Sequence, residues 1–128
     1  MIAVLLASAL MAEMPGWTPL PLKTPGPPEQ YAHYQRTEAD GTTTEIVGAR
    51  QKCECQPSTA ATMLGAAVAG RSAVVKRNKT ELCGVSAEHV LVTGIANREY
   101  QTHNIDQYFL RKNGTFYALS GYFDASAP

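Results

Sequence analysis

The residues whose types and spacing could do chemistry in this chain are three cysteines, Cys53, Cys55 and Cys83. Two thiols separated by one residue, as in Cys53-Glu54-Cys55, can chelate a soft metal ion or form a disulfide with each other. A structural zinc site would need four ligands, and a thioredoxin-like redox site would need two residues between its cysteines. Thiol or metal chemistry at Cys53-Glu54-Cys55 is therefore our alternative interpretation.

The interpretation that we favour is a structural disulfide formed in an oxidising compartment. Three cysteines leave one thiol over, and the economical pairing joins Cys83 to either Cys53 or Cys55. Such a bond would close a loop of about 30 residues and would stabilise the fold by ~3–4 kcal/mol. We expect no bound metal ion and no cofactor.

The histidines suggest a second kind of chemistry, because a hydrolase could combine an imidazole with a carboxylate and a hydroxyl nucleophile. The candidates for such a set are His33, His89, His103, Glu88, Asp106, Ser86 and Ser120. The sequence has no Gly-x-Ser-x-Gly motif, no common phosphate-binding motif and no His-Glu-x-x-His motif. We therefore assign no catalytic residue and favour a role that is not enzymatic.

A helix is predicted directly after the cysteine pair. Pro57 suits a first helical turn, where a backbone N–H would lack an intrahelical partner. Gly70 suits the position just after the last turn. Between them an apolar stripe recurs at helical spacing, through Ala60, Met63, Leu64, Ala67 and Val68. We expect this stripe to pack on a sheet.

Two β-hairpins are predicted from turn dipeptides that tolerate positive φ. A two-residue turn at Asp40-Gly41 gives a first register that pairs Ala39 with Thr42, Arg36 with Glu45 and Tyr34 with Val47. A two-residue turn at Asn113-Gly114 gives a second register that pairs Leu110 with Tyr117 and Tyr108 with Leu119. Aromatic, β-branched and opposite-charge pairs across both ladders support these turns.

The segments Ala73–Arg77 and His89–Ala96 are predicted to be further strands, the second of them central in the sheet. Lys76-Arg77-Asn78-Lys79 is the only basic cluster, and we interpret it as a solvated turn. The chain has 11 Lys and Arg against 11 Asp and Glu, so it lacks the net positive charge of a nucleic-acid binder. The predicted fold class is α+β, an antiparallel sheet of five or six strands packed by one main helix.

The first twelve residues form an apolar run that ends in small residues, which is typical of a secretory signal peptide. We therefore predict a signal peptide at 1–12, a Pro-rich N-terminal arm at 13–30 and a single α+β domain at 31–124. The arm is expected to lay Trp17, Leu20 and Leu22 along the domain. No long apolar segment follows residue 12, so we expect a periplasmic or secreted protein without a membrane span in its mature form.

These features together resemble small exported proteins of Gram-negative bacteria. The resemblance rests on the leader, Pro15-Gly16-Trp17, Cys53-Glu54-Cys55-Gln56-Pro57, Leu82-Cys83-Gly84 and the late aromatic hairpin. The order of elements and the hairpin at 109–119 are also similar to PsbP-like α/β domains, over residues 30–123. That resemblance implies a sheet packed against helices that serves as a binding or assembly module.

We therefore expect an exported, non-enzymatic accessory module that binds an unidentified protein or envelope component through its sheet or its Pro-rich arm. Aromatic side chains are good candidates for such a surface because they combine a large apolar body with a polar tip. The candidates in this chain are Trp17, Tyr31, Tyr100 and Tyr122.

Overall fold

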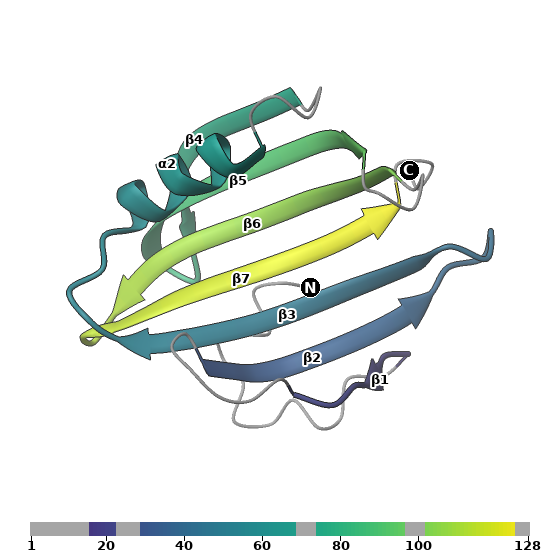
Figure 1. Cartoon of the computed structure of the whole chain (residues 1–128). Helices are drawn as coiled ribbons and strands as arrows, with labels where there is room; N and C mark the ends of the chain where they lie inside the picture. Colours follow the sequence, from purple (N-terminus) through teal and green to yellow (C-terminus); the bar gives the residue numbers. More distant parts are fainter. Residues whose placement is uncertain (1–15, 23–28, 69–73, 97–101, 125–128) are drawn as a thin grey trace.

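The computed structural model describes residues 16–22, 29–68, 74–96 and 102–124, which hold seven strands and one helix (Figure 1). The strands are β1 (Thr18–Pro19), β2 (Glu29–Thr37), β3 (Thr43–Lys52), β4 (Val74–Leu82), β5 (Val85–Ala96), β6 (Thr102–Lys112) and β7 (Thr115–Asp124). The helix is α2 (Pro57–Val68), between β3 and β4. The predicted signal peptide at 1–12 and Tyr100 lie outside the described residues.

All seven strands belong to one antiparallel sheet in the order β1-β2-β3-β7-β6-β5-β4. The β2–β3 hairpin leads into α2, which carries the chain to the far edge of the sheet. From there β4 to β7 return as a meander, and β7 pairs with β3 from Thr115 to Phe123. The predicted α+β class is wrong, because the described chain is mostly β and its single helix is short.

The hairpin of β6 and β7 confirms the prediction made from Asn113-Gly114. Both turn residues have positive φ, 52° and 76°, as a two-residue type I′ turn requires. The ladder pairs Leu110 with Tyr117 and Tyr108 with Leu119, as expected.

The register predicted for the hairpin of β2 and β3 is wrong by one residue. Tyr34 pairs with Ile46 and Arg36 with Thr44, because the loop has three residues and not two. Gly41 N–H donates to the carbonyl of Glu38 at 3.0 Å, and only Gly41 has positive φ, 87°. This is a type I turn followed by a bulge glycine.

The carboxylate of Asp40 explains why the shorter turn does not form. It accepts hydrogen bonds from the backbone N–H of Thr42 at 2.9 Å and from the Thr42 hydroxyl at 2.6 Å. In a type I′ turn at Asp40-Gly41, the N–H of Thr42 would donate to the carbonyl of Ala39, so the Asp40 side chain competes with the hydrogen bond that closes the shorter turn.

The basic cluster that we interpreted as a turn lies instead in the middle of β4. The turn between β4 and β5 comes later, at Cys83 and Gly84, whose φ values of 52° and 78° again fit a type I′ turn. Of the strand predicted at Ala73–Arg77, the structure describes Val74 to Arg77, and the strand continues to Leu82.

Each face of the sheet carries its own apolar cluster, because neighbouring side chains along a strand point to opposite faces. The helix face gathers Val90, Val92, Phe109 and Phe116 under Ala61 and Val68 of α2. The opposite, helix-free face gathers Trp17, Ala32, Tyr34, Ile46, Ala87, Leu110 and Leu119. Two layers of core on one sheet explain why Leu110 and Phe109 are both buried although they are adjacent.

The buried side of α2 matches the predicted stripe only in part, at Ala60, Leu64 and Val68. Ala61 and Val68 are buried against β5 and β6, whereas Met63 is 66% exposed and Ala67 is also exposed. The helix covers only the part of the sheet nearest β4 (Figure 1), and Ala60 and Leu64 also pack against the apolar cluster of the helix face. Among the described residues, no helix has the length and apolar character needed to cross a membrane.

Residues 16–22 of the N-terminal arm lie along the edge of the sheet. Thr18 pairs with Gln35, and the backbone N–H of Leu20 donates to the carbonyl of His33 at 2.9 Å. Trp17 is buried in the cluster of the helix-free face, while Leu22 remains 45% exposed. The arm therefore covers part of the β2 edge.

Candidate functional site

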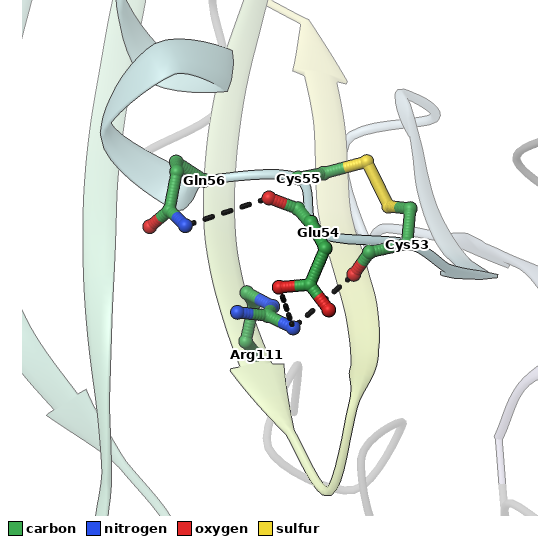
Figure 2. The surroundings of a disulfide bond; sticks show 5 residues. All are labelled: Cys53, Glu54, Cys55, Gln56 and Arg111. Carbon is green, nitrogen blue, oxygen red and sulfur yellow. Dashed lines mark hydrogen bonds and ion pairs between the residues drawn. A yellow bond between two sulfur atoms is a disulfide. The ribbon is translucent and has the colours of Figure 1, made fainter.

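Cys53 and Cys55 form a disulfide with each other, in the link between β3 and α2 (Figure 2). The expected bond to Cys83 is not formed. Cys83 lies exposed in the β4–β5 turn, and strands β7, β6 and β5 separate that edge of the sheet from β3. Neighbouring strands are about 4.8 Å apart, so several strand spacings separate Cys83 from the cysteine pair. This distance is too long for a disulfide, whose two Cα atoms lie within about 7 Å of each other.

Hydrogen bonds from two other side chains fix the disulfide link. Arg111 donates from Nη2 to the carbonyl of Cys53 at 3.2 Å and to the carboxylate of Glu54 at 3.5 Å. Gln56 donates from Nε2 to the carbonyl of Glu54 at 3.4 Å. Figure 2 shows the guanidinium of Arg111 lying under the loop. The Glu54 side chain is almost fully exposed, so its ion pair with Arg111 contributes little.

The disulfide packs its apolar side against the cluster of the helix face, and both cysteines are half-buried. This arrangement can take part in thiol–disulfide exchange if a reductant reaches the sulfur atoms. Within the described residues, no group of three or more His, Cys, Asp or Glu side chains is placed to hold a metal ion.

The second notable feature is β4, which forms the outer edge of the sheet. All of its residues from Val74 to Glu81 are exposed. Val74 and Val75 are 56% and 40% exposed, although they are large apolar side chains. In the described part of the chain, no strand pairs with the outer side of β4. An open edge of this kind can accept a strand from another protein.

A cavity of about 310 Å³ adjoins this edge, between the start of α2 and the two strands β4 and β5. Its walls are formed by Pro57, Ser58, Lys79, Thr80, Ser86, Ala87 and Glu88. A volume near 300 Å³ is at the lower end of the range for small-molecule pockets. The cavity can therefore take a side chain or a small polar group.

Arg77 holds the helix and the edge strand together on this face. Its guanidinium donates to the hydroxyl of Thr62 at 2.8 Å and to the carbonyl of Ser58 at 3.1 Å. Its Nε lies 3.4 Å from the carboxylate of Glu88, which is only 6% exposed. The buried charge of Glu88 is thus compensated, and Arg77 has a structural partner.

The structure brings together two members of the hypothetical hydrolase set. His89 Nε2 is hydrogen-bonded to Asp106 Oδ1 on the helix-free face, and the imidazole stacks on Tyr108 at 4.5 Å between ring centroids. Burial, and to a smaller extent the Asp106 carboxylate, raises the pKa of Tyr108.

The hydroxyl candidates are not in the same place. Ser86 lies three positions before His89 on β5, and Ser120 pairs with Gln107, the neighbour of Asp106. Both serines therefore point to the helix face. His33 is paired with Glu45 at 3.2 Å, and the side chain of His103 lies outside what the structure describes. A triad of these residues is not assembled in the described residues.

The aromatic candidates do not share one surface. Trp17 is buried and has the guanidinium of Arg36 at 4.5 Å from its ring. Tyr31 is half-buried on the helix-free face, in contact with Arg50 and Tyr117. Burial raises the pKa of Tyr31, the neighbouring Tyr117 adds to this, and Arg50 opposes it.

The third described aromatic candidate, Tyr122, is half-buried and pairs with Ile105 of β6, which packs against the helix-face cluster. Sequence reasoning missed the β4 edge and Arg111. Cys83-Gly84 was the signal that could have revealed the edge, because it marks the turn that ends β4.

No protein-family model and no curated protein matches this sequence. Among solved structures, the fold is similar to that of LpqN from Mycobacterium tuberculosis, a protein involved in cell envelope biogenesis, with a TM-score of 0.56. The two sequences are 16% identical, and the match covers 88% of this chain and 67% of LpqN. The resemblance to PsbP-like domains is not confirmed. At this level of identity, what this chain shares with LpqN is its fold.

Proposed function

We propose that this protein is a non-catalytic binding module of the cell envelope, which holds a protein or an envelope component by the edge of its sheet. The observation that carries the proposal is the open edge strand β4 with a cavity beside it. The shared fold with LpqN, a protein of envelope biogenesis, supports an envelope role for this chain.

A binding role also fits the placement of the polar residues. His89 and Asp106 are on the helix-free face, whereas the serines that could act as nucleophiles point to the other face. Acyl transfer would need the imidazole and the hydroxyl within about 3 Å of each other. The arrangement therefore favours recognition over hydrolysis.

Export is supported by two independent features. The apolar run at 1–12 is typical of a signal peptide. The Cys53–Cys55 bond is of a kind that persists outside the cytosol, where thiols are not kept reduced. We accordingly propose a periplasmic or secreted location.

The test is to express the full chain with a C-terminal tag in a Gram-negative host and to fractionate the cells. We expect a periplasmic or envelope-bound protein, cleaved near Ala9 or Ala12, with one disulfide in its intact mass. The purified protein should then sediment saturably with one isolated envelope fraction. An uncleaved chain that stays in the cytosol would contradict the proposal. So would a purified protein that sediments with none of the envelope fractions.

Matched charge reversals sharpen this sedimentation experiment. Lys79→Glu changes an exposed lysine of β4 beside the cavity, and Lys112→Glu changes an exposed lysine at the end of β6. We expect the first variant to lose binding to the envelope fraction and the second to keep it. Equal losses would indicate non-specific attraction to the protein's charge.

Thiol–disulfide exchange is the second candidate, because the two half-buried cysteines are bonded and the residues next to them, Glu54 and Gln56, are exposed. A substrate thiolate would attack one sulfur, break the S–S bond and release the other sulfur as a thiolate. A second substrate thiol would then resolve the mixed disulfide, leaving an oxidised substrate and a reduced Cys53/Cys55 pair.

To test the exchange, the protein is equilibrated with a glutathione buffer whose reduction potential is about −200 mV. Free thiols are then alkylated and counted by mass measurement. Reduction of the pair in this buffer would support exchange. A bond that stays oxidised down to about −300 mV would leave only a structural role.

A further inference from the structure

The open edge of β4 has a defined pattern of backbone groups. In a two-residue hairpin, the residues that flank the turn form a hydrogen-bonded pair, and such pairs alternate along the ladder. Leu82 and Val85 flank the turn, and the register continues without a bulge to Val74 and Thr93. The even-numbered residues of β4 therefore direct their N–H and C=O groups to β5.

The odd-numbered residues of β4 direct their N–H and C=O groups outward, away from β5. These outward groups belong to Val75, Arg77, Lys79 and Glu81, and they form a regular row that another strand can pair with. The other edge of the sheet differs, because β1 and the backbone N–H of Leu20 already pair with β2. The β4 edge is thus the one that the described residues leave open over nine residues.

The charges along this edge indicate what kind of strand fits. Lys79 lies on the helix face and Lys76 on the helix-free face, and no hydrogen bond or ion pair engages either ammonium group within the described residues. The third basic residue, Arg77, is already paired with Glu88. Glu81 is the single acidic residue of the strand.

A second copy of the chain is a poor occupant of the edge. Two antiparallel copies related by a two-fold axis can pair along the full strand only when the axis passes through Asn78. Arg77 then lies directly opposite Lys79 in both halves of the pair. Like charges directly opposite each other destabilise a ladder. The two free lysines favour acidic side chains in their place.

We propose that β4 receives an extended acidic segment of an envelope protein as an additional antiparallel strand, with carboxylates opposite Lys76 and Lys79. This inference rests on the proposed binding function and names its partner. The outward backbone groups supply the pairing, and the two lysines set the register and the charge preference. The cavity beside Lys79 leaves room for a side chain of the added strand on the helix face.

The probe is a synthetic peptide as long as β4, with blocked ends, built of threonine and valine with two glutamates three positions apart. These glutamates face Lys79 and Lys76 when the peptide lies antiparallel. We expect saturable binding to the mature protein, and we expect the affinity to fall as salt is raised. A peptide with lysines in place of the glutamates should bind at least about tenfold more weakly.

Lys79→Pro tests the backbone pairing. Proline removes an outward N–H and leaves the ladder to β5 intact, because proline is tolerated where an edge strand faces solvent. The matched control Lys79→Thr removes the same charge and keeps the N–H. We expect the proline variant to bind the acidic peptide at least about fivefold more weakly than the threonine variant. Equal affinities would overturn the pairing mode.

A second variant keeps the proposal testable if proline disturbs the fold. Lys76→Glu/Lys79→Glu should reverse the preference, so that the lysine peptide binds better than the glutamate peptide. An unchanged preference would overturn the acidic partner. If the peptide fails while the protein still sediments with an envelope fraction, only the strand-addition proposal is lost. Loss of sedimentation in the unmodified protein would instead contradict the proposed function.

Discussion

Reduction of the Cys53–Cys55 bond is expected to lower the free energy of unfolding by only about 1.6 kcal/mol. In the chain-entropy model, the stabilisation grows with the logarithm of the number of residues that the bond encloses. This bond encloses three residues, Cys53 to Cys55. A bond from Cys55 to Cys83 would enclose about 29 residues and would contribute about 3.6 kcal/mol in the same model.

The assay is urea unfolding of the oxidised and the reduced protein, followed by circular dichroism. At about 4 °C per kcal/mol for a domain of this size, the oxidised form should also melt about 6 °C higher than the reduced form. The control is Cys83→Ser, which leaves the Cys53–Cys55 bond in place. Its oxidised and reduced forms should therefore differ by the same amount as those of the unmodified protein.

Two results would refute this reasoning. A difference near 3.6 kcal/mol would indicate a long-range disulfide. Loss of the difference in Cys83→Ser would show that Cys83 takes part in the bond. Either outcome would also remove the thiol pair at the start of α2 as a candidate for exchange chemistry.

Three further substitutions test the fold. Gly48→Ala should destabilise the protein by about 1–3 kcal/mol, because a Cβ at this position would lie 2.7 Å from Cζ of Tyr31. In urea unfolding, the same substitution should lower the free energy of unfolding by less when Tyr31 is replaced by alanine. Equal losses in the two backgrounds would contradict the contact. Cys83→Asn should raise the stability by about 0.5–1 kcal/mol, since Asn adopts the positive φ of a type I′ turn more readily, and a lower melting temperature would argue against that turn. Hydrogen bonds from Thr42 lower the pKa of Asp40 below 3.8, so the ionised carboxylate stabilises the fold above that pH. The unmodified protein should therefore have a higher free energy of unfolding than Asp40→Ala, and this difference should fade as pH falls through the folded pKa. A difference in free energy of unfolding that persists unchanged at about pH 2 would contradict this prediction.

The sequence could predict those elements in which the turn residues favour a single backbone conformation. Asn113-Gly114 favours positive φ at both positions, so the turn, the register and the buried pairs of β6 and β7 all followed from it. Asp40-Gly41 is ambiguous, because the Asp carboxylate can also cap the following residues and lengthen the loop. One additional loop residue moved every pair of that ladder.

The open edge could not be recognised by hydrophobic pattern. Every residue of β4 from Val74 to Glu81 is exposed, so the strand has no buried alternation, and its lysines resemble those of a loop. The number of strands was underestimated because β1 is only two residues long and lies in a proline-rich segment.

The candidate site combines parts of the chain that sequence order separates. The cavity joins the start of α2 to β4 and β5, and Arg111 reaches the disulfide from β6. Disulfide pairing likewise depends on which strands lie between two cysteines, and spacing along the chain does not reveal this. The bond between Cys53 and Cys55 was one of the alternatives that the sequence left open, but the favoured pairing with Cys83 was wrong.

Amide hydrogen exchange of the mature protein, alone and with the envelope fraction that binds it, tests the central claim most directly. The outward amides of β4 should exchange rapidly in the free protein, because water reaches them. We predict that exchange slows in Val74–Leu82 when the envelope fraction is present and stays unchanged in Glu29–Thr37. Binding that leaves β4 unprotected, or that protects the opposite edge, would contradict the account.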